Sequence, residues 1–394
     1  MAISVITLVA GLGPRNACAQ GTPSDPPLAF RPPAVPLLVR TPYLSIWQPA
    51  DTLPGTWPTF WNGDTKAITG IIRIDDKAYV FMGNPRDFAD GKAQDFPLRM
   101  VQSAFTITPT QTRYSLTAGG VELDLDFLSP VEPSDLRRQS LPFGYLFAQA
   151  FSRDGKRHRV SLYFDISAEW AHGDNHAPVT AGRESVPGTT KRDPAITAVT
   201  VTAANPKELS ENRDYPSWGT AVFAAAQEKG LTSQIGPDEL VRPFGARHDG
   251  LDGSLDANLP RAINDHWPVL AFEKNLGGVA HDAPSKPFTL ILGHVREPAV
   301  SYMGKAIAPL WKSYFPTWQQ AVAFVARCTR GPRQSRYPGP QGNGGCNECG
   351  WPEVRLAVRA RVSAGVWGDG TRRHGGDALD TDERNQQRGQ CFDH

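Results

Sequence analysis

Cysteine is absent from the long middle of this chain of 394 residues. Cys18 lies near the N-terminus, and the other four cysteines, Cys328, Cys346, Cys349 and Cys391, all follow residue 326. A span of about 300 residues can bury a core without disulfide bonds, so a small disulfide-stapled scaffold is excluded. A surplus of one charge is also missing, because 41 lysines and arginines balance 40 acids. A protein that binds nucleic acid through excess basic charge is therefore not expected.

Long hydrophobic runs are missing too, apart from one at the N-terminus. Residues 2–13 form an apolar run of the length found in signal peptides, which is too short to span a bilayer as a helix. Ala17-Cys18-Ala19 then offers a small-x-small cleavage site, although no Lys or Arg precedes the run. We expect residues 1–19 to be a cleaved signal peptide, which predicts a secreted protein without a membrane segment. A buried N-terminal strand is the alternative.

Proline and glycine, by contrast, are abundant, with 35 and 37 residues. Together with short β-branched runs, they favour an all-β fold over a helical bundle. Apolar and acidic residues alternate most clearly over residues 121–128, as in a half-buried strand. We predict a two-sheet antiparallel β-sandwich with a short C-terminal helix and a disordered tail. The expected strands are 67–74, 78–82, 103–108, 112–117, 121–128, 144–151, 159–166, 196–202, 220–226, 268–272 and 288–293.

The chain divides by composition into further segments. Residues 20–65 are proline-rich and aromatic, which predicts an extended segment laid over a surface. The sandwich is expected over residues 66–304, with 227–266 as a functional excursion or a mobile loop because it lacks periodicity. Residues 305–326 predict a connecting helix, with Thr317 as N-cap and with Trp318, Ala321, Val322 and Val325 on one face.

Residues 327–394 differ sharply from the rest, with eleven arginines, twelve glycines and no lysine. Such composition is typical of GC-rich DNA translated in the wrong frame or through an intron, and we expect this tail not to pack on the sandwich. A natural disordered tail or a small metal module are the alternatives. Cys346 and Cys349 form a C-x-x-C pair, but no second pair follows at zinc-finger spacing, so neither a metal site nor a cofactor is predicted.

Motifs that mark the common catalytic classes are also absent. The sequence contains no G-x-S-x-G elbow, no P-loop, no H-E-x-x-H and no dinucleotide fingerprint. The remaining catalytic candidates are three carboxylates. Asp165 and Glu169 close a predicted strand and could form an acid/base or sugar-recognition pair, and Asp265 precedes another strand. Capping of strand ends and closure of turns are the structural alternatives.

Four aromatic residues in the proline-rich segment suggest a second kind of site. Trp47, Trp57, Phe60 and Trp61 could stack on sugar rings, which would make the chain a carbohydrate- or cell-wall-binding module. Burial as packing anchors for the extended segment is the other interpretation. Small-molecule and glycan ligands therefore both stay open.

A family resemblance enters at Pro54–Trp61, in the sequence PGTWPTFW. This motif is similar to the N-terminal region of fungal and bacterial secreted glutaminase A-like proteins. Further matching blocks follow in order and extend the resemblance over about residues 35–325: RTPYLS (40–45), YVFMG (79–83), LSPVEP (128–133), DLRRQSLP (135–142), DISAEW (165–170), RAIND (261–265) and GHVREPAV (293–300).

The resemblance implies a β-sandwich that precedes a helical toroid similar to six-hairpin glycosidases, in a hydrolase that converts L-glutamine to L-glutamate and ammonia. The match stops near Phe324, so we expect the second domain to be missing here and the apolar face of the helix before residue 326 to be left exposed. The resemblance therefore implies an accessory sandwich, inactive alone, whose partner is that helical domain. It assigns no catalytic residue within the sandwich.

Overall fold

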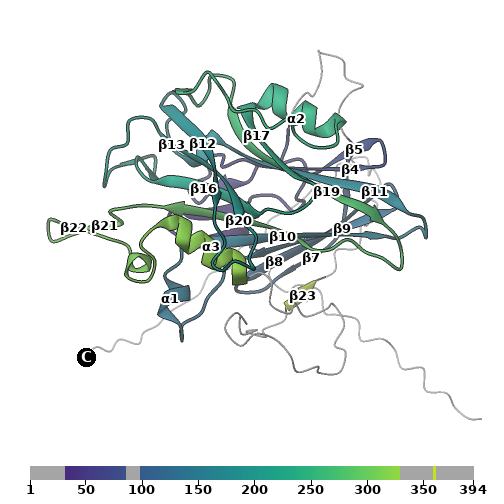
Figure 1. Cartoon of the computed structure of the whole chain (residues 1–394), viewed down its shortest axis with the longest axis horizontal. Coiled ribbons are helices and arrows are strands. Elements are labelled where there is room, and N and C mark those ends of the chain that lie inside the picture. The colour runs from purple at the N-terminus through teal and green to yellow at the C-terminus, as the bar shows by residue number, and fades with distance from the viewer. Residues whose placement is uncertain (1–31, 86–97, 329–357, 361–394) are drawn as a thin grey trace, which may run out of the picture. The chain divides into compact units, whose positions relative to one another are not determined.

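The computed structural model describes residues 32–85, 98–328 and 358–360. Two large sheets dominate (Figure 1). The first has ten strands in the order β18-β12-β13-β16-β20-β10-β9-β8-β7-β23. Its strands are β7 (Val101–Ile107), β8 (Gln111–Ala118), β9 (Val121–Leu128), β10 (Phe143–Ser152), β12 (Pro178–Val186), β13 (Ile196–Ala203), β16 (Thr220–Ala226), β18 (Arg261–Ala262), β20 (Phe288–Val295) and β23 (Val358–Ala360).

The second sheet has six strands in the order β17-β19-β11-β4-β5-β6. They are β4 (Ile68–Ile74), β5 (Lys77–Met82), β6 (Leu98–Arg99), β11 (His158–Ser167), β17 (Leu231–Pro237) and β19 (Pro268–Val279). The pairings within both sheets are antiparallel except for the short β5–β6 pair. Leu123, Leu125 and Phe127 of β9 and Leu162 and Phe164 of β11 belong to one buried core. The predicted two-sheet antiparallel sandwich is therefore confirmed.

Smaller elements join these sheets. A three-stranded sheet contains β1 (Val35–Thr41), β2 (Leu44–Gln48) and β3 (Thr59–Phe60), and two short pairs are β14 (Glu211–Asn212) with β15 (Tyr215–Pro216) and β21 (Val300–Tyr302) with β22 (Lys305–Ile307). The helices are α1 (Leu136–Gln139), α2 (Asp238–Arg247) and α3 (Trp318–Cys328), with 3₁₀ turns η1 (Ala168–Trp170) and η2 (Leu310–Ser313). No helix in the described residues is both long and apolar enough to cross a membrane.

Three expectations about the irregular segments are wrong. Residues 227–266 hold β17, α2 and β18, so the segment is not one long loop, and only residues 248–260 within it form a long irregular stretch. Residues 305–326 are helical only from Trp318, because Pro309 and Pro316 interrupt the earlier part and β22 and η2 occupy it. Val358–Ala360 pairs with β7, contrary to the expected separation of the tail at these three residues, and residues 329–357 and 361–394 lie outside the described residues. The signal segment and the C-x-x-C pair lie outside the described residues.

Helix α3 also corrects an expectation about its apolar face. As a connecting helix without its second domain, it is expected to leave this face exposed. Ala321, Val322 and Val325 are instead fully buried, in one cluster with Tyr145 and Ile291 of the ten-stranded sheet. The Thr317 Oγ1 accepts from the Gln320 N–H at 3.3 Å, which confirms the predicted N-cap. The helix therefore completes the sandwich rather than serving as an open docking face.

Candidate functional site

The candidate site lies along strand β11, on the outer face of the six-stranded sheet. The predicted carboxylates lie near one end of the strand, and a pocket lies at the other end. Its even-numbered residues, such as Leu162 and Phe164, belong to the core between the sheets. By the strand period, Arg159, Ser161, Tyr163 and Asp165 therefore face outward. Helix α2 covers the middle of this face, and Gly245 permits the close approach, because a Cβ there would lie 2.3 Å from the Tyr163 ring.

Asp165 is locked in a buried ion pair. Its side chain has 0% exposure, and its two oxygens accept from the Nε and Nη2 of Arg242 at 2.9 and 3.1 Å. The Tyr163 hydroxyl also donates to the Oδ2 at 2.8 Å. Arg242 uses its Nη1 to donate to Asp238 at 2.7 Å, and its guanidinium lies 5.2 Å from the centre of the Trp57 ring. This geometry ties α2 and the proline-rich segment to β11, and it occupies both oxygens of the predicted catalytic group.

Glu169 lies in the same neighbourhood but in a different environment. It is buried in η1, and its Oε2 accepts from the Ser167 hydroxyl at 2.6 Å. Burial raises the pKa of Glu169 to about 7, against the opposing effects of the Ser167 hydrogen bond and the Arg242 charge. Glu169 can therefore hold a proton near neutral pH.

Asp265 lies at the exposed rim of this neighbourhood. Its N–H donates to the Ala262 carbonyl at 3.0 Å, as in the turn-closing alternative. Its carboxylate is 3.8 Å from the Nε2 of His266, whose Nδ1 contacts Glu239 in the first turn of α2. Next to Glu239, burial raises the pKa of Asp238 to about 6. The three predicted carboxylates therefore gather around the start of α2, but no bonded acid/base pair links them.

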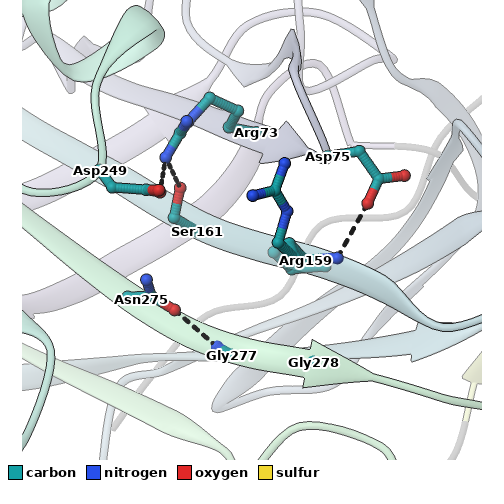
Figure 2. Close-up of a pocket in the computed structure, with 9 residues that line it drawn as sticks. Arg73, Asp75, Arg159, Ser161, Asp249, Asn275, Gly277 and Gly278 are labelled. Carbon is teal, nitrogen blue, oxygen red and sulfur yellow. Dashed lines mark hydrogen bonds and ion pairs between the residues drawn. The ribbon is translucent and has the colours of Figure 1, made fainter.

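A pocket of about 260 Å³ lies at the other end of β11, and sequence reasoning missed it. Figure 2 shows Arg73 reaching Asp249 and Ser161, with Asp75 beside the backbone of Arg159. The polar residues at alternate positions of the predicted strand 159–166 could have indicated this pocket. No sequence signal indicated that Asp249 lies at the pocket, because it follows helix α2, which was not predicted. The lining residues are Arg73, Asp75, Arg159, Val160, Ser161, Asp249, Asn275, Gly277 and Gly278.

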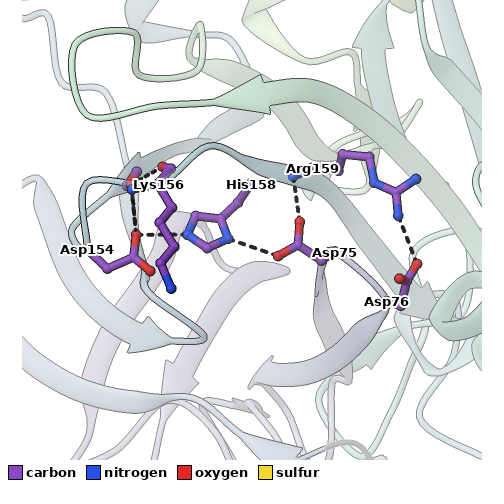
Figure 3. A network of polar contacts seen from close by, with 7 residues as sticks. Asp75, Asp76, Asp154, Lys156, His158 and Arg159 are labelled. Atoms are coloured by element: carbon purple, nitrogen blue, oxygen red, sulfur yellow. Dashed lines mark hydrogen bonds and ion pairs between the residues drawn. The ribbon is translucent and has the colours of Figure 1, made fainter.

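A histidine network borders this pocket (Figure 3). His158 contacts Asp75 through Nδ1 at 2.9 Å and Asp154 through Nε2 at 3.0 Å. The hydrogen bonds that His158 donates to Asp75 and Asp154 raise the pKa of His158 and lower the pKa of both carboxyls. Asp75 also accepts from the Arg159 N–H at 2.9 Å. The network fixes the β4–β5 turn against the start of β11, and thereby fixes one wall of the pocket.

The four aromatic residues of the proline-rich segment do not form one platform. Phe60 is 1% exposed, Trp47 and Trp57 are half-buried, and Trp61 is 57% exposed. Trp57 lies against Arg242, whereas Phe60 contacts Tyr215 at 4.4 Å between ring centres. Packing therefore accounts for three of the rings, and the interpretation of the four aromatic residues as buried anchors is wrong for Trp61.

Phe60 is part of an aromatic box around a buried lysine. The Nζ of Lys66 lies 4.6, 5.2 and 5.0 Å from the ring centres of Phe60, Trp170 and Tyr215, and it donates to the Tyr43 carbonyl at 2.7 Å. Burial lowers the pKa of Lys66 to about 7.

Within the described residues, no group of three or more His, Cys, Asp or Glu side chains is arranged to hold a metal ion.

Comparisons with known proteins show which protein families this chain matches. Residues 110–328 match the family model "Domain of unknown function (DUF5127)", and residues 20–87 match "Domain of unknown function (DUF4964)". A solved structure described as "Putative kojibiose phosphorylase from human microbiome" aligns with a TM-score of 0.30 and 10% identity, over 70% of this chain and 27% of that one. A likeness this weak carries no argument.

Two curated relatives share a name. "Glutaminase A" of Aspergillus oryzae is 38% identical over 307 residues, which are 75% of this chain and 42% of the relative. "Probable glutaminase" of Arthroderma benhamiae is 28% identical over 316 residues, which are 74% of this chain and 35% of the relative. The chain thus spans less than half the length of either. It belongs to the DUF5127 family and is a glutaminase A-like protein.

Proposed function

We propose that this chain is the accessory β-sandwich of a secreted glutaminase A-like amidohydrolase, and that glutamine hydrolysis requires the part of the relatives that the chain does not span. The observation that carries the proposal is the 38% identity to glutaminase A over 42% of its length. Amide hydrolysis needs a nucleophile or activated water, a proton donor and an oxyanion site. Asp165, the central acid candidate, is instead held by Arg242 and Tyr163.

An apolar hairpin supports a partner for the sandwich. Strands β21 and β22 extend from the sheets (Figure 1), and their turn exposes Tyr302 and Met303 by 63% and 84%. Val300 and Ile307 are 51% and 40% exposed on the same hairpin. Exposed apolar side chains gathered in this way mark interaction surfaces. We propose that this hairpin contacts the helical domain that the family resemblance implies.

A chimera tests both parts of the proposal. The matching 307 residues of Aspergillus oryzae glutaminase A are replaced by those of this chain. We expect the chimera to release ammonia from L-glutamine, because the sandwich supplies the surface on which the remaining domain is built. A second chimera carries Tyr302→Ser and Met303→Ser, and we expect it to unfold at a lower temperature and to lose turnover. A folded first chimera without turnover would contradict the proposal.

A further inference from the structure

The pocket on β11 is lined mainly by charged and polar residues and is open to solvent. Only Val160 among its lining residues is aliphatic, and no aromatic ring lines it. A site for an apolar ligand or a stacked sugar ring needs such groups, so both ligand classes fit poorly. The volume of about 260 Å³ lies below the range of about 300–1,000 Å³ typical of drug-sized ligands. The pocket is therefore suited to a small polar molecule.

The charges that line the pocket balance. Arg73 and Arg159 contribute two positive charges, and Asp75 and Asp249 contribute two negative ones. A site for a free anion such as phosphate would carry a positive surplus. Balanced charges of both signs instead complement a ligand that is itself neutral overall but carries both an anionic and a cationic group.

The arginines retain donors for such a ligand. Arg73 uses its Nη2 toward Asp249 and Ser161. The Arg159 side chain is 71% exposed, and its ion pair with Asp76 is a surface contact that can exchange.

The acidic and amide side chains of the pocket provide the other contacts that such a ligand needs. The side chains of Asp75 and Asp249 are 49% and 60% exposed, so an ammonium group can reach them from solvent. The Asn275 Oδ1 accepts from the Gly277 N–H at 2.7 Å, which leaves its amide nitrogen as the group to offer a ligand carbonyl. The Ser161 hydroxyl lines the pocket beside Arg73 and Asp249 (Figure 2).

We propose that this pocket binds a free α-amino acid as its zwitterion, with the carboxylate held by Arg73 and Arg159 and the ammonium by Asp75 and Asp249. Asn275 and Ser161 then favour an amino acid with a polar side chain. The site goes beyond the proposed function, because it needs no hydrolytic group and lies within the sandwich itself. It would give the accessory domain a ligand of its own.

Amide NMR shifts on titration test this site. L-glutamine, acetate and methylammonium are titrated separately into the isotope-labelled chain, and the backbone amides of Ser161, Gly277 and Gly278 are followed. We expect L-glutamine to shift these amides and to bind at least about tenfold more tightly than acetate or methylammonium, since both charged ends contribute charge-assisted hydrogen bonds. L-leucine should bind more weakly than L-glutamine.

Exposed substitutions separate binding from folding. Arg159→Gln and Asp249→Asn should each weaken L-glutamine binding by about tenfold, the loss of one charge-assisted contact. Asp76→Asn, which removes the competing partner of Arg159, and Arg113→Gln, on β8, should preserve it. The proposal is overturned if acetate binds as tightly as L-glutamine, if the pocket amides do not shift, or if neither Arg159→Gln nor Asp249→Asn weakens binding. A chain that binds L-glutamine but never hydrolyses it would still support it.

Discussion

Arg242→Met should destabilise the fold by about 3–5 kcal/mol, the loss expected when a buried charge is left without its partner. Asp165 has 0% side-chain exposure, and the substitution removes both of its hydrogen bonds from Arg242. The Asp238 contact at 2.7 Å is lost as well. Denaturant unfolding followed by tryptophan fluorescence measures the change.

Matched variants show whether the pair itself causes this loss. Arg113→Gln breaks an ion pair of 3.0 Å whose arginine is 53% exposed, and it should cost less than about 1 kcal/mol. Asp165→Asn combined with Arg242→Met should cost less than the sum of the two single changes, because no buried charge is then left unpaired. A cost of Arg242→Met below that of Arg113→Gln would refute a structural role for the pair.

Lys66→Met should remove a large part of the pH dependence of stability. The pKa of Lys66 is lowered from 10.5 to about 7 in the fold, so between these values the unfolded chain holds a proton that the folded chain lacks. The natural protein should therefore gain stability as pH rises from about 7 to 10.5, by about 2–5 kcal/mol at about 1.4 kcal/mol per pKa unit. The gain in stability should stay below the upper value, because the three aromatic rings around Lys66 stabilise its charged form in the fold.

The difference in unfolding free energy between the natural protein and the Lys66→Met variant isolates the contribution of Lys66 at each pH, since both proteins share the other titrating groups. At pH 6 the Met variant should be more stable, by less than the full range because the Tyr43 carbonyl loses its hydrogen bond. At pH 10 the advantage should vanish or reverse. Stability curves that run parallel from pH 6 to 10 would show that the lysine does not titrate in this window.

The strands were the most predictable part of the molecule. The predicted range 121–128 coincides with β9, and 220–226 coincides with β16, because alternating or continuous β-branched runs bounded by turns leave little ambiguity. The proline-rich segment concealed β1 and β2, since prolines suggested an extended strip without pairing partners. Long-range pairing decides such cases, and it cannot be read from local residues.

Helix α2 was missed for a different reason. It contains Pro243 and Gly245, which local propensity places outside helices, yet the helix is held by its packing on Tyr163 and by Arg242. The candidate acids were located correctly at strand ends, but the partner that defines Asp165 lies 77 residues away. The pocket depends on the same tertiary approach, through Asp249.

Ammonia release from L-glutamine by the purified 394-residue chain tests the central claim most directly, with Aspergillus oryzae glutaminase A assayed beside it. The account predicts turnover by the relative and none by this chain, because the sandwich commits Asp165 to Arg242 and lacks the remaining length of the relatives. Turnover by the chain comparable to that of the relative, and abolished by Glu169→Gln, would contradict it and place the hydrolytic centre within the sandwich.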